Sequence, residues 1–377
     1  FAYDEAESLA ARGLRQVEAM VQGPERDARE LEVRLAVGVT SLLRRGYAAP
    51  ETAYSMRRAR ELCAALGDAP ALSSALWVLL LYLIAHGELA ESEGIAEQLL
   101  RMAEQENDPA LLVAAHCSFT GLYTHMGRFE EALAHQAETD RIVTPELQKA
   151  IRRRFVPEPV LMSRSEQLRC FTILGRVHEG KVVREALRRE SELRADPRDS
   201  AFVAQFIAEF DLFLGDYESC ERISARSVAL CEEYGIASER LWAMGYLGAA
   251  RARLGHSEEG IATITAVLQI LDSIECRITT PFFHAMLSGA LIRSGDARGG
   301  LAEAQRALEI GMQTGEHAWD GELWQLVAVA RTALGDAGDA TEAAQVEAAW
   351  HSASEIATRI GAKGLEARIT RARDAVV

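Results

Sequence analysis

One stretch has the spacing of a phosphate-binding loop. Residues 175–182 (GRVHEGKV) match the pattern GxxxxGK, in which backbone N–H groups and a lysine hold phosphates. The pattern then needs Ser or Thr for Mg²⁺, where this chain has Val182, and it needs a preceding β-strand, where residues 168–174 are expected to form a helix. An ordinary helix–turn–helix is therefore the favoured interpretation, with phosphate binding as the alternative.

Histidines and cysteines are the other candidates for chemistry. His116, His125 and His135 stand nine or ten residues apart, which favours core or groove positions over a metal site. The six cysteines form no CxxC pair, a pattern typical of reduced thiols in a cytosolic protein. No HExxH, GxSxG or strand-linked GxGxxG occurs. We therefore expect no catalytic residue, no metal and no cofactor in this chain, which should not itself be an enzyme.

The elements that would carry such residues are helical hairpins. Residues 108–143 show the plan: Asp108-Pro109 can cap a helix, an apolar 3.6-residue period follows, and Gly127 allows a turn before a second helix. Equivalent turn glycines are predicted at Gly46, Gly87, Gly127, Gly180, Gly215, Gly255, Gly295 and Gly335. Their intervals are 41, 40, 53, 35, 40, 40 and 40 residues. A recurring period of this length indicates a helical solenoid.

The predicted fold class is therefore all-α: a right-handed solenoid of about eight helix pairs with a period of roughly 40 residues. We expect one superhelical domain over residues 1–377. Within it, residues 1–22 would be the trailing helix of an upstream repeat, 143–163 an insertion, and 362–377 a capping helix. Pro24, Pro145, Pro157 and Pro159 are expected in connections, and the other five prolines at helix starts.

Charge indicates which partners to expect. The net charge of −15 disfavours nucleic acid and anionic membranes, and no run of 18 uncharged apolar residues exists, so a cytoplasmic protein is expected. Residues 145–195 are an exception, with 12 Lys/Arg against 7 Asp/Glu. Arg152, Arg153 and Arg154 could dock an acidic partner there. A solvated loop with helical ion pairs is the alternative.

The hairpins resemble tetratricopeptide repeats. That motif has a bulky residue early in its first helix, a Leu-Gly or Leu-Ala pair in the middle of that helix, an aromatic residue one helical turn later, and a small residue after the turn between the helices. The matching residues here are Trp324, Leu247-Gly248, Tyr123, Ala132 and Ala340. The longer period is similar to that of the solenoids of bacterial signal-transduction ATPases, including the maltose-regulon activator type.

A more specific resemblance lies in residues 25–38 (ERDARELEVRLAVG), 45–51 (RGYAAPE) and 59–68 (ARELCAALGD). These segments look like the start of the C-terminal repeat region in proteins that place a class III nucleotide cyclase domain and a P-loop ATPase domain ahead of the repeats. The resemblance implies a regulatory arm for protein interaction or ligand sensing, in a fragment of a longer chain. The alternatives are the sensor arm of a LuxR-type transcriptional activator and a free-standing adaptor. The oligomeric state is not predicted.

In a tetratricopeptide array the first helix of each pair lines a concave groove. That resemblance predicts groove positions for Trp77, Phe202, Gln205, Glu209, Trp242 and Phe282. Exposed aromatic side chains there would anchor a protein or peptide partner. The alternative is that the longer helices move these residues into the core.

The phosphate-loop pattern yields the first prediction. The isolated chain should hydrolyse no ATP and form no cyclic nucleotide, because it lacks the strand and the Ser/Thr that the motif needs. A phosphate-release assay and a cyclic-nucleotide assay check this. ATP hydrolysis that disappears in Lys181→Ala would contradict our interpretation of residues 175–182.

Overall fold

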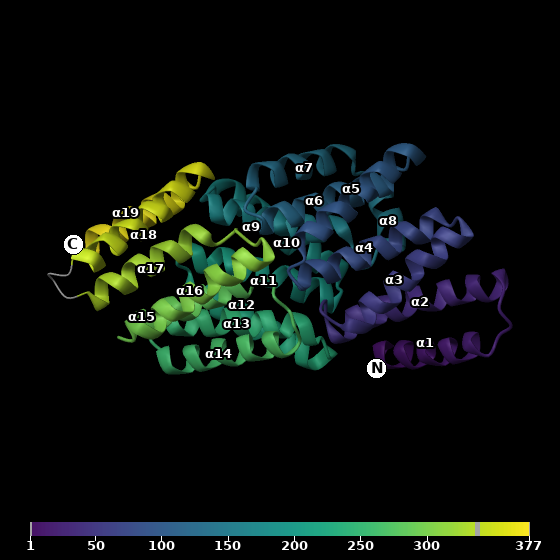
Figure 1. Ribbon diagram of the computed structural model, residues 1–377, viewed down its shortest axis with the longest axis horizontal. Coiled ribbons are helices and arrows are strands. Elements are labelled where there is room, and N and C mark those ends of the chain that lie inside the picture. Colours follow the sequence, from purple (N-terminus) through teal and green to yellow (C-terminus); the bar gives the residue numbers. More distant parts are fainter. Residues whose placement is uncertain (1, 336–339, 377) are drawn as a thin grey trace.

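The computed structural model describes residues 2–335 and 340–376, and this part of the chain contains nineteen helices and no strand (Figure 1). Helix α1 (Ala2–Glu18) comes first and α19 (Lys363–Val376) last, while α8 (Pro145–Arg154) lies between the third and fourth pairs. The eight pairs are α2 (Pro24–Arg45) with α3 (Pro50–Leu66), α4 (Ala69–Ala85) with α5 (Leu89–Glu106), α6 (Pro109–His125) with α7 (Phe129–Ile142), α9 (Pro159–Leu174) with α10 (Val177–Arg194), α11 (Pro197–Leu214) with α12 (Tyr217–Tyr234), α13 (Ala237–Arg253) with α14 (Ser257–Ser273), α15 (Thr280–Arg293) with α16 (Ala297–Thr314), and α17 (Asp320–Leu334) with α18 (Ala340–Arg359). The all-α solenoid of eight pairs is confirmed.

The fourth turn differs from the prediction. Helix α9 ends at Leu174, and Gly175 makes the turn in the left-handed region, at φ 72°. Gly180 instead lies inside α10, where a Cβ atom would come within 2.4 Å of the Phe210 ring. With Gly175 in place of Gly180, the intervals become 41, 40, 48 and then 40 throughout. The repeat is therefore more regular than the sequence interpretation suggested.

The prediction that four prolines lie in connections is wrong for three of them. Pro24, Pro145 and Pro159 begin α2, α8 and α9. A proline at the first helical position loses no intrahelical hydrogen bond, so it marks a helix start as readily as a loop. Only Pro157 lies in a connection, between α8 and α9. Residues 143–163 are thus not one continuous helix, as predicted, but they contain α8 rather than a loop alone.

The two helices of a pair differ in how they are buried. Residues on every side of α4 are buried, because this helix packs against its partner, its neighbours and the interior of the superhelix. Helix α5 has a single buried stripe, at Leu89, Ser92, Ile95, Ala96, Leu99 and Ala103. One main apolar core extends from Leu31 to Ile369 along the array. First helices therefore lie inside and second helices outside.

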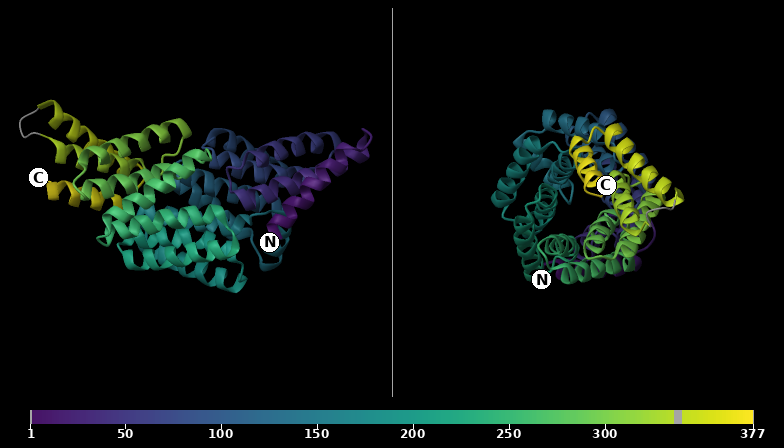
Figure 2. Two further views of the ribbon diagram at one scale, coloured as in Figure 1. Left: turned by 90° about the horizontal axis from the view of Figure 1, so that it is seen from below. Right: turned by 90° about the vertical axis from the view of Figure 1, so that its left-hand side faces the viewer.

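The superhelix closes on itself, and the pairs encircle a common axis (Figure 2). The carbonyl of Ala85, at the end of α4, accepts hydrogen bonds from the amides of residues 277 and 278, at 2.8 and 3.1 Å. One repeat further on, the carbonyl of His125 accepts from the amides of residues 317 and 318, at 2.9 and 3.2 Å. The last carbonyl groups of a helix lack intrahelical hydrogen-bond donors. Amides of the later turn therefore supply donors to the free carbonyls of the earlier turn.

A third contact of this kind joins α19 to α9. The backbones of Gly175 and Gly364 are so close that a Cβ atom on Gly175 would lie 2.7 Å from the Gly364 Cα atom. Only glycine fits such an approach. The predicted capping helix, α19, therefore also holds two turns of the superhelix together. No helix in the described ranges is both long and apolar enough to cross a lipid bilayer.

The packing of α7 yields the second prediction. Ala132 has no exposed surface, so Ala132→Trp should lower the free energy of unfolding by about 1–3 kcal/mol through overpacking. Ala134, on the exposed face of the same helix, provides the matched control Ala134→Trp. Urea unfolding of both variants checks this. Equal stability of the two would show that the helix register is wrong.

Candidate functional site

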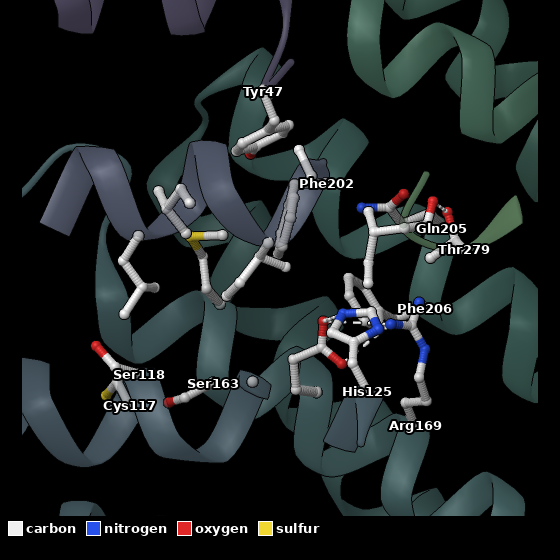
Figure 3. Close-up of a pocket in the computed structure, with 18 of the residues that line it drawn as sticks. Tyr47, Cys117, Ser118, His125, Ser163, Arg169, Phe202, Gln205, Phe206 and Thr279 are labelled. Atoms are coloured by element: carbon white, nitrogen blue, oxygen red, sulfur yellow. Dashed lines mark hydrogen bonds and ion pairs between the residues drawn. The ribbon is translucent and has the colours of Figure 1, made fainter. Parts of the chain in front are cut away.

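The first helices of five successive pairs enclose a cavity of about 790 Å³, its open mouth included (Figure 3). Residues from α4, α6, α9, α11 and α13 line it, together with Ile278 and Thr279 from the loop that docks on α4. Because that loop belongs to the later turn, closure of the superhelix completes the cavity wall.

Most of the wall is apolar. Trp77 and Trp242 line the cavity, and each indole N–H is already bound: Trp77 donates to the Pro157 carbonyl at 3.0 Å, and Trp242 to the Thr279 hydroxyl at 2.9 Å. Their remaining surface is hydrocarbon. The other apolar lining residues are Tyr47, Leu80, Leu81, Ile84, Met162, Phe202 and Phe206. This part of the cavity favours an apolar group.

One end of the cavity is polar, and a chain of buried ionic contacts forms it. His125 lies 3.4 Å from Glu316 and 3.7 Å from Glu166. Arg169 contacts Glu166 and Glu209, both at 3.0 Å. These residues come from α6, α9, α11 and the loop before α17, so the network joins elements far apart in the sequence.

The network continues beyond these groups and reaches both turns of the superhelix. Glu209 accepts a hydrogen bond from the Tyr246 hydroxyl at 2.6 Å. Glu316 accepts from the backbone N–H of Thr279, at 3.0 and 3.2 Å to its two oxygens. Three carboxylates therefore face one guanidinium and one imidazole, so carboxylates outnumber cations in this network. Glu166, Arg169 and His125 line the cavity, whereas Glu209 and Glu316 do not.

Burial and neighbouring charges together shift the pKa values of Arg169 and Tyr246. Burial alone would lower the pKa of the Arg169 guanidinium, but Glu166 and Glu209 outweigh it and hold that pKa well above its ordinary value. Burial, with the charge of Glu209, raises the pKa of Tyr246. Arg169 thus stays charged and Tyr246 stays a phenol at physiological pH.

One polar side chain in the cavity lacks a partner. Gln205 is 7% exposed, and no hydrogen-bond donor in the described structure reaches its Oε1 atom. Figure 3 shows its side chain beside Thr279 and above His125. A buried carbonyl oxygen without a donor costs stability, so this atom can accept a hydrogen bond from a ligand.

The structure separates the predicted groove residues. Trp77, Phe202, Gln205 and Trp242 line the cavity, and all except Trp242 are largely buried. Glu209 and Phe282, each 1% exposed, do not line it. Glu209 belongs to the ionic network, whereas Phe282 packs in the core against Tyr246 and Trp319, with ring centres 5.4 and 4.7 Å away. Core burial, the alternative reading, holds for Phe282. Whether the four cavity residues bind a partner stays a prediction.

Sequence reasoning missed the ionic end of the site. His125 was expected at a core or groove position, but no ionic partner was predicted for it. Glu166 and Arg169 looked like ordinary helix residues, and Glu316 stands between helices with no motif around it. Glu166 and Arg169 are three residues apart, which indicates a helical ion pair but not its burial. The only signal for Glu316 is its place in the inter-repeat loop, which becomes informative once the closure is known.

The three predicted docking arginines do not form one surface. Arg154 donates to Asp108 and to the Ser73 hydroxyl, so it ties α8 to α4 and α6. Arg152 and Arg153 are exposed, and Arg152 has Asp199 at 4.0 Å. Docking of an acidic partner stays a prediction, and only Arg152 and Arg153 are placed for it.

The other candidates for chemistry are placed as follows. A helix, α9, precedes Gly175, and Lys181 is an exposed residue of α10. His116 and His135 contact each other, with their Nδ1 atoms 2.9 Å apart, while His125 lies elsewhere. Within the described ranges, no cluster of three or more His, Cys, Asp or Glu side chains could hold a metal ion.

Comparisons with known proteins identify a fold. No family model matches the chain, and no curated protein matches it significantly. Among solved structures, the Rap protein in complex with Competence and Sporulation Factor is similar with a TM-score of 0.55 at 13% identity, over 92% of this chain and 98% of that one. This similarity supports a tetratricopeptide-like solenoid.

Two further solved structures are similar at lower scores. A signal-transduction ATPase with a tetratricopeptide-repeat sensor from Pyrococcus horikoshii has a TM-score of 0.49 at 14% identity, over 99% of this chain and 55% of that one. PlcR of Bacillus thuringiensis, in complex with the peptide PapR7 and DNA, has a TM-score of 0.47 at 15% identity, over 70% of this chain and 98% of that one.

The buried network yields the third prediction. Arg169→Met should lower the free energy of unfolding by about 3–5 kcal/mol, because Glu166 and Glu209 then lose their buried cation. Arg188→Met is the control, since Arg188 forms exposed ion pairs with Glu185 and Glu192, and exposed pairs contribute little to stability. Urea unfolding at pH 7 measures both. Similar small losses in the two variants would contradict a structural role for Arg169.

Proposed function

We propose that this chain is a non-catalytic regulatory module that binds a peptide in its inner cavity. The observation that carries the proposal is the buried Gln205 Oε1 atom, which lacks a donor in a cavity whose wall is mostly apolar. A peptide could supply a donor to this atom through its backbone N–H groups, and its side chains could fill the apolar part of the cavity. The bound segment would contact both turns of the superhelix, because Ile84 of α4 and Thr279 of the later loop lie in the same cavity.

The charge of the cavity restricts the ligand further. The polar end holds more carboxylates than cations, so a carboxylate or phosphate group would meet repulsion there. We therefore propose a neutral or cationic peptide with apolar side chains. Acidic peptides should be excluded.

Several observations support a binding role over catalysis. Burial raises the pKa of the Cys117 thiol, which lines the cavity, to about 12, so the sulfur stays protonated and is a poor nucleophile. Arg169 and its carboxylates are committed to one another. None of these groups is placed as a free acid or base.

Residues 25–68 support a place for the module in a longer signalling protein. Their resemblance to repeat regions that follow nucleotide cyclase and ATPase domains is the basis of this part of the proposal. The alternatives are the sensor arm of a transcriptional activator and a free-standing adaptor. Peptide-dependent nucleotide turnover by the full-length protein favours the cyclase and ATPase parent. Peptide-dependent DNA binding favours the transcriptional activator.

The cavity itself provides the fourth prediction. Gly121 lies on α6 at the cavity wall, and a Cβ atom there would meet only the Glu166 Cγ atom, at 3.8 Å. Gly121→Leu should therefore fill the cavity without disturbing the backbone, and replacing a mid-helix glycine should not lower stability. We expect this variant to lose peptide binding.

The test is a thermal-shift screen of five-residue apolar peptides, followed by calorimetry. Gly94→Leu is the matched control, because Gly94 is an exposed glycine of α5 with open space around it. Peptides should raise the melting temperature of the wild type and of Gly94→Leu but not of Gly121→Leu. The proposal fails if no peptide binds, or if Gly121→Leu binds as the wild type does.

A further inference from the structure

A second cavity lies on the inner side of the later repeats. It measures about 1020 Å³, its open part included, and residues of α11, α13, α15, α17 and α19 line it, with Tyr217 at the start of α12. Leu212, Phe213, Met286, Leu326 and Val329 supply apolar wall. Stacked rings at Phe213, Phe282 and Trp319 stand between this cavity and the network around Glu209.

The charge of this second cavity is opposite to that of the first. Three arginines line it, Arg253, Arg293 and Arg368, and among the described residues Glu322 is the only acidic one in the lining. The charged side chains that line this cavity therefore have a net positive charge, although the whole chain has a net charge of −15. Cations gathered without matching carboxylates attract an anion.

The three guanidiniums are incompletely paired. Arg368 donates to Glu322 at 2.8 Å, but its Nε atom is buried with no acceptor. Arg253 lies over the Tyr217 ring at 4.6 Å and donates to that hydroxyl. Arg293 has no carboxylate within 4.0 Å among the described residues. Arg293 therefore has N–H groups available to a ligand, and Arg368 has a buried N–H group without an acceptor.

Of the three arginines, Arg293 is the one whose pKa is lowered by its surroundings. Its side chain is open to solvent within the concave face, yet the surrounding protein reduces its hydration, and this desolvation, with repulsion from Arg253, lowers its pKa to about 10. The guanidinium remains charged at pH 7. An anion beside it would relieve the repulsion between the two arginines.

A neighbouring amide adds to the case. The Oε1 atom of Gln325 lies in the same cavity, buried and without a donor. Rotation of the amide by half a turn presents its NH₂ group instead, so Gln325 can donate to an oxyanion bound between the arginines. The cavity thus combines unpaired donors with an apolar wall.

Helix dipoles explain only part of this arrangement. Arg253 and Arg293 lie in the last turns of α13 and α15, where a cation is favourable. That effect accounts for neither the buried Arg368 Nε atom nor the unpartnered Gln325. The shared feature of all four residues is the cavity that they line.

We propose that this second cavity is a binding site for an oxyanion on an apolar body, a carboxylate or a phosphate ester. Arg293 and Arg368 hold the anionic oxygens, Gln325 donates to them, and Phe213 and Leu326 contact the apolar part. The site is independent of the peptide cavity, which has the opposite charge and different lining residues.

The experiment is calorimetry on the whole chain with two probes, octanoate and octyl phosphate, at constant ionic strength. At least one should bind, and the tighter of the two identifies the anion. Arg293→Gln should weaken that binding about tenfold or more, as loss of a hydrogen bond to a charged group implies. Arg188→Gln, at an exposed ion pair, should bind as the wild type does.

The two sites can be tested separately. Gly121→Leu should bind the anionic probe normally even though it fills the first cavity, and Arg293→Gln should bind peptide normally. The inference is overturned if neither probe binds at millimolar concentration, or if Arg293→Gln binds as the wild type does. Equal loss of probe binding in Arg188→Gln would also overturn it, since it would show attraction by general charge.

Discussion

The structure depends on contacts between one turn of the superhelix and the next. The ends of α4 and α6 leave carbonyl groups free, and loops nearly two hundred residues later supply amides to them. Glu316 strengthens this closure, because the same carboxylate accepts from Thr279 of one later loop and contacts His125 of the earlier turn. Since donors and acceptors on both sides recur every 40 residues, the contact repeats in register. Successive turns of the solenoid are therefore fixed against each other.

This closure gives the inner surface two sites of opposite character. The first cavity is complete only where the later loop carrying Thr279 meets α4, and its polar end holds an excess of carboxylates. The second cavity belongs to the later repeats and holds an excess of guanidiniums. A module with both could respond to two chemically distinct ligands, and binding in the first would act directly on the contact between turns.

The sequence predicted the repeat well and the site in part. A regular period and helix-start prolines identify hairpins because each depends on local backbone chemistry. The same local reasoning could not choose between Gly175 and Gly180, five residues apart, because the choice rests on Phe210 leaving no space beside Gly180. It placed six residues at groove positions on first helices. Trp77, Phe202, Gln205 and Trp242 line the cavity, whereas Glu209 and Phe282 are buried and do not. Contacts such as that of Glu316 with His125 join residues 191 positions apart and carry no local signal.

Hydrogen exchange of Glu316→Ala tests the central claim most directly, namely that a buried carboxylate holds the two turns together around the cavity. The amide of Thr279 loses its acceptor in this variant, and the amides of residues 277, 278, 317 and 318 belong to the same closure. We expect these five amides to exchange at least about tenfold faster than in the wild type, while amides within α2 and α3 keep their rates. Unchanged exchange at all five would contradict the account, because the turns would then be held together without Glu316.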